Sequence, residues 1–351
     1  MADLRNTPHK RLNILTGEWI LVSPHRNKRP WQGKIESSEG KSRPSHDPKC
    51  YLCPGNLRAG GEKNPYYSST YSFTNDFSAL VPSGERGEVN HDDLIIAETE
   101  SGICRVICFS PRHDLSIAEM EIESILNVIE IWISEYESLS SDESVNYITI
   151  FENKGELMGC SNPHPHGQIW AQRTIPNEPQ KEGLLQKKYS EDKGGCLLCD
   201  YLKKERELNE RIIAGNDDFL LVVPYWAMWP YETIILPKFH SQNILSLTGK
   251  EKNNLAGIIK ATAVRYDNLF ETSFPYSMGF HQAPSDNRNH DEWHWHIHFY
   301  PPLLRSSSVK KFMVGYEMLA EPQRDFTPEA SAKRLRELPL IHYKNNEKKE
   351  F

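Results

Sequence analysis

One short segment, Asn162-Pro-His-Pro-His-Gly-Gln168, carries three side chains that can hold a metal or attack a phosphate. Its two prolines keep the backbone extended, and an extended chain places alternate residues on one face, about 6 to 7 Å apart. His164, His166 and Gln168 are therefore expected to point the same way. A histidine-containing surface loop is the alternative interpretation, but the prolines and the partner residues described next favour a site.

The pair Cys50-x-x-Cys53 has the spacing at which two thiolates bind tetrahedral zinc. His113 and His164 are candidates for the other two ligands. Two small buried hydrophobic residues are the alternative interpretation of the same cysteines. A closed site with four protein ligands is normally structural, and here it would anchor the strand that carries His166.

His166 is the candidate nucleophile. A neutral imidazole needs no deprotonation to attack phosphorus, and the phosphorus–nitrogen bond keeps the transferred group activated for a second acceptor. Gly167 is expected to permit close approach of a ligand, and Gln168 offers an amide to a phosphoryl oxygen. Ser161 and Asn153 are placed to donate further hydrogen bonds, although turn chemistry is the simpler explanation for each residue taken alone.

The second half of the chain repeats these parts in the same order. It contains, in turn, Cys196-x-x-Cys199, Pro237-Lys-Phe-His240, an expected helix and His294-x-His296-x-His298. Three features in one order indicate a duplicated unit, with halves at 1–176 and 177–351.

The local patterns predict a mixture of helices and strands. Helices are expected at 115–139, where Ser116-x-x-Glu119 resembles a capping box, from Thr248 onward, and from Thr327-Pro328 onward. Strands are expected at 105–109, 146–151, 168–173, 220–224, 233–236 and 294–300, and a polar loop at 32–49. The elements do not alternate as βαβ units, which predicts an α+β fold with largely antiparallel sheets.

The composition is that of an ordinary globular protein. Its 351 residues are 38% hydrophobic and 25% charged, with a formal charge of -7 and a pI of about 6.1. This acidic balance argues against nucleic-acid binding, including binding by a zinc knuckle. No apolar run is long enough for a membrane span, and the N-terminus lacks a signal peptide. Seven cysteines, four of them in two Cys-x-x-Cys pairs, indicate metal thiolates in a reducing compartment, so we expect a cytoplasmic protein.

The segment from Gly159 to Gln168 closely resembles the active-site signature of the galactose-1-phosphate uridylyltransferase family, part of the histidine-triad superfamily. Similar segments extend over nearly the whole chain, at Val22–Trp31, Phe73–Phe77, Val222–Ala227, Phe274–Gly279, Pro301–Arg305, Lys310–Glu317 and Gln323–Arg324. The resemblance implies two histidine-triad-like units with antiparallel sheets and flanking helices.

The resemblance also implies a ping-pong reaction. His166 would attack the α-phosphorus of UDP-glucose, and galactose 1-phosphate would then collect the uridylyl group as UDP-galactose. Gln168 would bind phosphoryl oxygens, and Asn75, Asp76 and Asn153 would hold the nucleotide. In a homodimer with shared sites, the sugar nucleotide would also contact Arg26, Arg29, Lys311, Phe312, Tyr316, Glu317 and Gln323. A relative that acts on another nucleotide sugar, such as ADP-glucose, and a nucleotide hydrolase are the alternatives.

Two metal sites follow from the same resemblance. The family's zinc positions are taken by Cys50, Cys53, His113 and His164, and those of its second metal, iron or zinc, by Glu182, His281, His296 and His298. The chain departs from the family in having Cys196, Cys199 and His294, which with His240 reproduce the first quartet. The resemblance favours the set that contains Glu182, and the cysteine pair is then interpreted as an alternative or vestigial zinc site.

Overall fold

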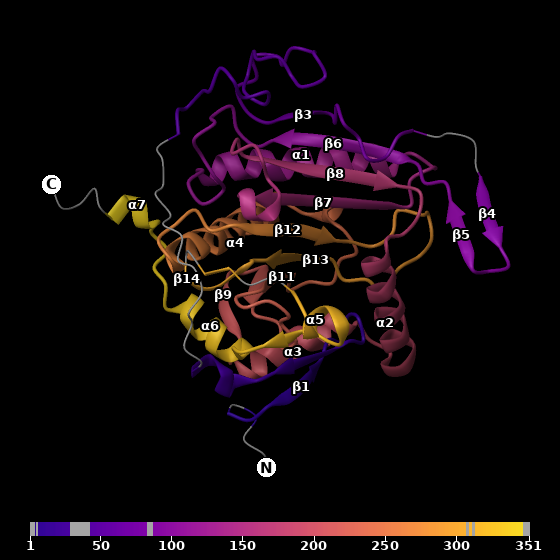
Figure 1. Cartoon of the computed structure of the whole chain (residues 1–351), viewed down its shortest axis with the longest axis vertical. Coiled ribbons are helices and arrows are strands. Elements are labelled where there is room, and N and C mark those ends of the chain that lie inside the picture. Colours follow the sequence, from indigo (N-terminus) through magenta and orange to yellow (C-terminus); the bar gives the residue numbers. More distant parts are fainter. Residues whose placement is uncertain are drawn as a thin grey trace.

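The computed structural model describes residues 4, 6–28, 43–82, 87–306, 309–310 and 313–346. Arg29, Lys311 and Phe312, to which the family resemblance assigns substrate contacts, lie outside these residues, as does most of the loop expected at 32–49. The described chain forms one large β-sheet with helices packed on it (Figure 1).

The large sheet has nine strands, and its neighbouring strands pair in antiparallel fashion. Their spatial order is β3 (Tyr71–Thr74), β6 (Gly102–Cys108), β8 (His166–Gln172), β7 (Tyr147–Lys154), β12 (Tyr276–His281), β13 (His296–Tyr300), β11 (Thr233–Pro237), β10 (Phe219–Val222) and β9 (Ile212–Gly215). The predicted strands overlap six of these, with small differences at their ends. The α+β class with antiparallel strands is thereby confirmed.

The strand order is symmetric about the β7–β12 pair. Outward from that pair, β7, β8, β6 and β3 mirror β12, β13, β11 and β10. In each half the four mirrored strands and one helix follow the order strand, strand, helix, strand, strand along the chain, with α1 (Ile122–Ser140) and α4 (Gly249–Leu269) as the helices. The two helices contact each other behind the sheet (Figure 1), and one cluster of buried apolar residues includes both halves.

Smaller elements cover the opposite face of the second half. α3 (Leu197–Leu208) and β2 (Trp19–Val22) bury Leu198 and Ile20 in a second apolar cluster with β10 and β11. The other elements are β1 (His9–Leu12), η1 (Pro24–Lys28), η2 (Glu156–Met158), α2 (Asn177–Lys193), η3 (Ile244–Ser246), β14 (Leu303–Ser306), β15 (Val309–Lys310), α5 (Tyr316–Leu319), β16 (Gln323–Arg324), α6 (Pro328–Arg336) and α7 (Tyr343–Asn346). Among the described helices, none has the length and apolar character that a bilayer crossing needs.

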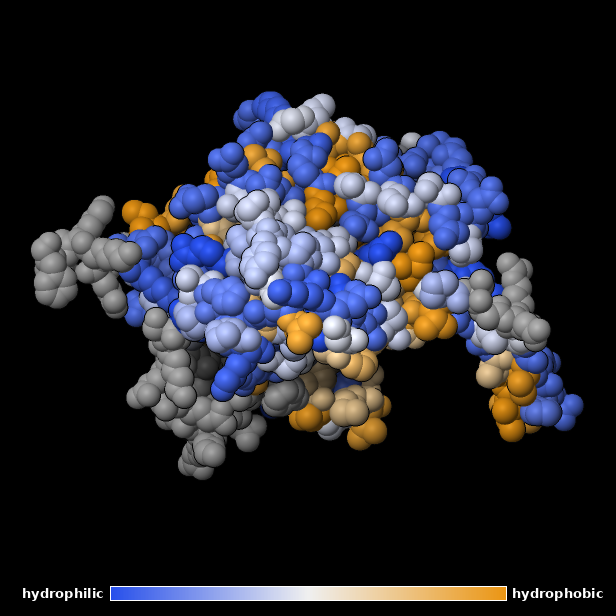
Figure 2. All heavy atoms as spheres, turned by 90° about the horizontal axis from the view of Figure 1, so that it is seen from above, coloured by the Kyte–Doolittle hydropathy of each residue, from blue (hydrophilic) through white to orange (hydrophobic). Residues whose placement is uncertain are grey.

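One hairpin stands apart from the main body. β4 (Glu88–His91) and β5 (Ile95–Glu98) pair only with each other and project at the right of Figures 1 and 2. Leu94 at its turn is 86% exposed, and Ile95 and Ile96 are 64% and 56% exposed. The hairpin therefore presents apolar side chains to its surroundings.

Two of the three predicted helix starts are confirmed. α4 begins with Thr248 as its N-cap and a complete capping box with Glu251. α6 begins with Thr327 as N-cap and Pro328 in the first turn. The third prediction was wrong, because α1 begins at Ile122 and not near residue 116. There the Ser116 hydroxyl donates to the Glu119 carboxylate (2.9 Å), and residues 116–120 close a turn of their own.

Candidate active site

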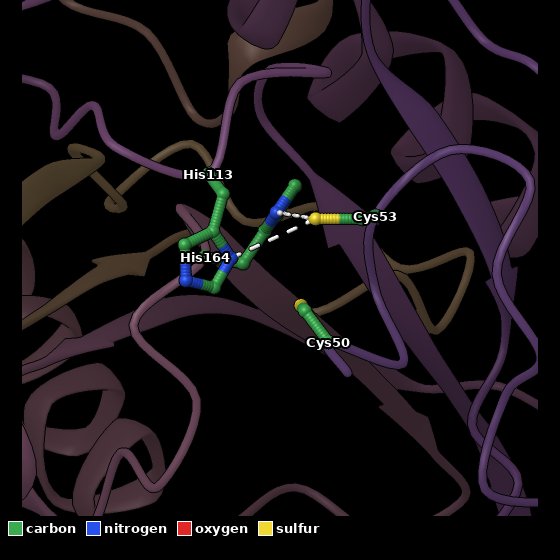
Figure 3. Close-up of side chains that lie close together, drawn as sticks. All are labelled: Cys50, Cys53, His113 and His164. Carbon is green, nitrogen blue, oxygen red and sulfur yellow. Dashed lines mark hydrogen bonds between the residues drawn. The ribbon is translucent and has the colours of Figure 1, made fainter. Parts of the chain in front are cut away.

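Cys50, Cys53, His113 and His164 converge on one point (Figure 3). Their ligand atoms lie within 4.8 Å of one another, and all four residues are buried. The Cys53 Sγ lies 3.5 Å from the Nδ1 of His164 and 3.7 Å from the Nδ1 of His113. Two thiols and two imidazoles at this separation fit the tetrahedral set that holds zinc. The structure thus brings together the quartet that the sequence indicated.

The surroundings of the quartet favour cation binding. The Nε2 of His164 donates a hydrogen bond to the Ser110 carbonyl (2.8 Å), which leaves a lone pair on the Nδ1 that faces Cys53. Burial lowers the pKa of His164 to about 3, so its ring is neutral. Burial also raises the pKa of the Cys53 thiol to about 12, and a bound cation would reverse that effect because the thiolate is the ligating form.

His166 begins strand β8, directly after this quartet. Its Nδ1 donates a hydrogen bond to the carbonyl oxygen of His164 (2.7 Å). Because a carbonyl only accepts, the proton sits on Nδ1 and the Nε2 carries the lone pair. Burial lowers the pKa of His166 below its usual value, which keeps the ring neutral near pH 7. His166 is therefore in the form that can act as a nucleophile.

A cleft of about 940 Å³ lies beside His166. Asn153 on β7 and Ser161 in the segment before β8 line it, as do residues 271–273 and 342–345. Its volume falls in the usual range for small-molecule sites. Three residues predicted to act on a phosphorylated substrate, His166, Asn153 and Ser161, thus share one cleft.

Three other predicted residues are not among the described residues that line this cleft. Gln168 accepts a hydrogen bond from the Nε1 of Trp170 (3.0 Å). Asn75 and Asp76 follow strand β3, and a carboxylate oxygen of Asp76 lies 3.4 Å from the Nε of Arg58. Gln168 lies on strand β8 of the first half, and Asn75 and Asp76 lie directly after its strand β3.

A second group of predicted substrate residues lies around α5 and β16. The group contains Arg26, Tyr316, Glu317 and Gln323. The Asp325 carboxylate accepts a hydrogen bond from Gln323 (2.9 Å) and lies 3.3 Å from the Nε of Arg26. Arg324 donates to Glu317 (2.8 Å). The described chain therefore presents two separate groups of predicted substrate residues.

Glu182, His281, His296 and His298 form another cluster of ligand atoms within 4.8 Å of one another. The Glu182 carboxylate lies 2.9 Å from the Nδ1 of His281, 3.4 Å from the Nε2 of His296 and 3.6 Å from the Nε2 of His298. Both Nε2 atoms are buried and lack a hydrogen-bond partner within the described residues. A cation would satisfy them, and one carboxylate with three imidazoles suits iron or zinc.

Comparison with known proteins identifies the family. The model of the N-terminal domain of galactose-1-phosphate uridyl transferase matches residues 1–176, and that of the C-terminal domain matches residues 181–347. The chain belongs to the galactose-1-phosphate uridyl transferase family. The two matched regions follow one another along nearly the whole chain.

Individual relatives agree with the family models. The galactose-1-phosphate uridylyltransferase of Haemophilus influenzae is 49% identical over 341 residues, covering 97% of each chain. That of Kluyveromyces lactis is 50% identical over 358 residues, covering 97% of this chain and 96% of its own. A solved uridylyltransferase superposes with a TM-score of 0.74 at 27% identity, covering 93% of this chain and 97% of that one. The ADP-glucose phosphorylase of Arabidopsis thaliana also has a TM-score of 0.74, covering 96% of this chain and all of its own, but at 22% identity it shows only a shared fold.

Sequence reasoning missed two residues that shape the cleft beside His166. The Arg43 guanidinium donates to the Pro163 carbonyl (2.7 Å) and so holds the histidine segment in place. Lys154, buried on β7, pairs with the Asp267 carboxylate (2.7 Å) from α4. A lysine within a strand signals a partner when the strand is buried, but nothing local could have indicated Asp267, 113 positions away.

The structure gives a reason of its own for glycine at position 167. A Cβ at this position would lie 2.8 Å from the ring of Phe109 and 2.8 Å from the carbonyl oxygen of Phe151. Close packing against the protein itself therefore requires glycine here, and the close approach of a ligand stays a prediction. This packing holds the start of β8 against its neighbours, immediately after His166.

Proposed function

We propose that this protein transfers UMP from UDP-glucose to galactose 1-phosphate, with the uridylyl group held on His166 between the two steps. Membership of the galactose-1-phosphate uridyl transferase family supports the reaction. The observation that carries the choice of nucleophile is the hydrogen bond from the His166 Nδ1 to the His164 carbonyl, beside a cleft of substrate size.

In the first step the Nε2 of His166 attacks the α-phosphorus of UDP-glucose. A phosphorus–nitrogen bond forms, the bond from that phosphorus to the bridging oxygen breaks, and glucose 1-phosphate leaves with the electron pair. The ring gains a positive charge, which the His164 carbonyl stabilises through the Nδ1–H. In the second step a phosphate oxygen of galactose 1-phosphate attacks the same phosphorus, the phosphorus–nitrogen bond breaks, and UDP-galactose forms.

Amides and hydroxyls beside His166 are assigned to the nucleotide and its phosphates. Asn153 accepts a hydrogen bond from the Ser277 hydroxyl (2.7 Å) at its Oδ1, so its NH₂ group is oriented to donate to a ligand. Ser161 is exposed in the same cleft, and its hydroxyl suits a phosphoryl oxygen. We assign Gln168 to the uridylyl intermediate and Asn75 and Asp76 to the nucleotide, as in the family signature.

The second group of substrate residues is assigned to the partner's site in a homodimer. Arg26, Tyr316, Glu317 and Gln323, with Arg29, Lys311 and Phe312, would then complete the cleft that holds the other subunit's His166. The projecting hairpin supports a dimer, because an isolated pair of strands with exposed apolar residues such as Leu94 and Ile95 is marginal in water unless covered.

Two metals are part of the proposal. Cys50, Cys53, His113 and His164 would hold zinc as a structural site that fixes the start of β8. Glu182, His281, His296 and His298 would hold iron or zinc and join α2 to β12 and β13. The seven cysteines are free, which suits the reducing cytoplasm that we assign.

The alternative substrate, ADP-glucose, is less well supported. Relatives at 49% and 50% identity are named as uridylyltransferases, whereas the ADP-glucose phosphorylase shares 22%. Nucleic acid remains an unexpected partner for a chain with a formal charge of -7.

Labelling of the intermediate tests the nucleophile. Incubation with UDP-glucose labelled at the α-phosphorus, without acceptor, is expected to leave acid-labile label on His166, and galactose 1-phosphate should discharge it as UDP-galactose. His166→Gly should abolish labelling, whereas the matched variant His91→Gly, on the exposed hairpin, should retain it. Undiminished labelling of His166→Gly would refute the assignment, and label that leaves only as free UMP would indicate a hydrolase.

A further inference from the structure

A third cluster of ligand atoms, outside the uridylyl-transfer site, joins Cys196, Cys199, His240 and His294. Its four ligand atoms lie within 4.8 Å of one another. The Cys199 Sγ lies 3.3 Å from the Nδ1 of His294 and 3.7 Å from that of His240, and the Cys196 Sγ lies 3.7 Å from the Nδ1 of His294. We propose that these four side chains bind a zinc ion, in a site that coexists with the Glu182 site.

The two clusters of the second half use different histidines. The sequence placed His294, His296 and His298 on one strand face and so presented the quartets as alternatives. In the structure β13 begins only at His296. The ring of His294 lies beside the two cysteines, whereas those of His296 and His298 lie beside Glu182. Separate ligand sets allow both sites to be filled at the same time.

The third cluster repeats, in the second half of the sheet, the contacts that the Cys50 cluster makes in the first half. The second cysteine of each pair is closest to the histidine before the strand, at 3.5 Å from Cys53 to His164 and 3.3 Å from Cys199 to His294. In each cluster the same sulfur lies 3.7 Å from the other histidine. The ring centroids of the two histidines are 5.6 Å apart in the first cluster and 5.7 Å apart in the third.

Backbone carbonyls orient both imidazoles toward the thiols. The Nε2 of His294 donates to the Pro237 carbonyl (3.0 Å), and the Nε2 of His240 donates to the Asp291 carbonyl (2.9 Å). Each Nδ1 therefore carries the lone pair and faces sulfur, which is the arrangement that fixes metal-binding histidines. Pro237 plays the part that Ser110 plays in the first cluster, since each carbonyl belongs to the third residue before a histidine ligand.

The chemistry of the four ligands selects the ion. Two thiols and two imidazoles, with no carboxylate in the set, favour zinc over magnesium or calcium. Cys196 is the N-cap of α3, while His240 follows β11 and His294 precedes β13. A bound ion would therefore fasten the start of α3 to the ends of two sheet strands. The inference does not depend on the reaction proposed above.

Metal content tests the site directly. The zinc-loaded wild-type chain is expected to hold one more equivalent of zinc than either the Cys196→Ser, Cys199→Ser double variant or His294→Gln. Glu182→Gln should keep the zinc of this site. The matched control, Cys50→Ser, Cys53→Ser, should lose the zinc of the Cys50 site instead. Equal zinc in wild type and in both third-site variants would overturn the proposal, as would loss of this equivalent in Glu182→Gln.

Two further measurements test the site, and the first uses only wild-type protein, so that it does not depend on whether a variant folds. In wild-type protein, zinc should protect Cys196 and Cys199 from N-ethylmaleimide, and chelation should expose them, because both side chains are only partly buried. In cobalt-loaded protein, the double variant should lose about half of the thiolate-to-metal charge-transfer absorption, since the Cys50 site supplies the rest. Full reaction of both cysteines in the presence of zinc would refute the zinc site.

Discussion

The reactive form of His166 is set by a single backbone carbonyl, and the second half of the chain shows the same arrangement put to a different use. His296 holds the matching position, and its Nδ1 donates to the His294 carbonyl (3.0 Å) as that of His166 donates to His164. The Nε2 of His296 faces Glu182, whereas His166 lines the large cleft. On the proposed assignments, the surroundings of Nε2 would decide whether the same imidazole binds a metal or attacks phosphorus.

Gly167 makes a prediction at the residue scale. Gly167→Ala should destabilise the protein by about 1 to 3 kcal/mol, because the new methyl group would lie 2.8 Å from Phe109 and from the Phe151 carbonyl. It should also slow labelling of His166, because the start of β8 must shift. Gly257→Ala, on α4 with open space around it, is the matched control and should be neutral or mildly stabilising in urea unfolding. An unchanged labelling rate would show that the packing does not position His166.

Glu329 predicts a pH dependence of stability. Burial alone would raise its pKa, but hydrogen bonds from Arg11 and Arg211 outweigh that effect and lower the pKa to about 2. A carboxylate with a lowered pKa stabilises the fold above its unfolded pKa, near 4.5, and the stabilisation is lost as the pH falls toward 2. The contribution at pH 7 is on the order of 3 kcal/mol.

Glu329→Gln should therefore lower the free energy of unfolding markedly at pH 7, and the difference from wild type should narrow when urea unfolding is repeated near pH 3. Because both proteins lose any bound metal alike, the difference isolates this carboxylate. Glu207→Gln, which removes an exposed ion pair with Lys204, should change little at either pH. A difference that stays constant with pH would contradict the assignment.

At the scale of elements, the sequence predicted best where a local pattern decides the structure. The capping box at Thr248 and the cap at Thr327 specify helix starts through contacts within four residues. The Cys-x-x-Cys pairs and the alternating histidines likewise predicted the clusters that the structure forms. The prediction was wrong at His294. This residue was assigned to a strand, but the strand begins only at His296, and the His294 ring lies beside the Cys199 sulfur.

Helix α2 escaped prediction because its buried face is polar. It buries Pro179, Glu182 and Gln186, so the apolar periodicity of an ordinary helix is missing. Glu182 is directed at three histidines, and the Gln186 side chain accepts a hydrogen bond from the backbone of His294 (3.1 Å). Only the tertiary structure reveals that this polar face has partners. The same limit applies to Lys154, whose partner Asp267 is distant in sequence.

The cap of α4 supports a prediction for that element. Thr248 and Glu251 exchange hydrogen bonds, from the Glu251 N–H to the Thr248 hydroxyl (3.3 Å) and from the Thr248 N–H to the Glu251 carboxylate (2.7 Å). Thr248→Ala removes the first of these and should cost about 1 kcal/mol. Thr248→Ser keeps the hydroxyl and should remain close to wild type in urea unfolding. Equal loss in both variants would mean that the threonine methyl, and not the cap, stabilises the helix.

At the scale of the whole molecule, two halves with matching strand order share one sheet but carry different side-chain clusters. The β7–β12 pairing joins the halves, and a single apolar cluster spans them. His166 belongs to the first half and lies in a cleft that residues of both halves line, while Arg26, Tyr316 and Gln323 lie around α5 and β16. The monomer therefore holds His166 apart from residues expected to bind the same substrate, and a two-fold dimer would bring them together.

Mixed dimers test this arrangement. His166→Gly and Arg26→Glu should each be inactive, the second because it replaces a cation expected at the phosphates with an anion. In a dimer with one subunit of each kind, shared sites place both substitutions in one cleft and leave the other intact, so about half of the wild-type activity should return. The subunits can be co-expressed with different tags and the mixed dimer purified on both. If each site were built from one chain, both clefts of the mixed dimer would be damaged and no activity would return.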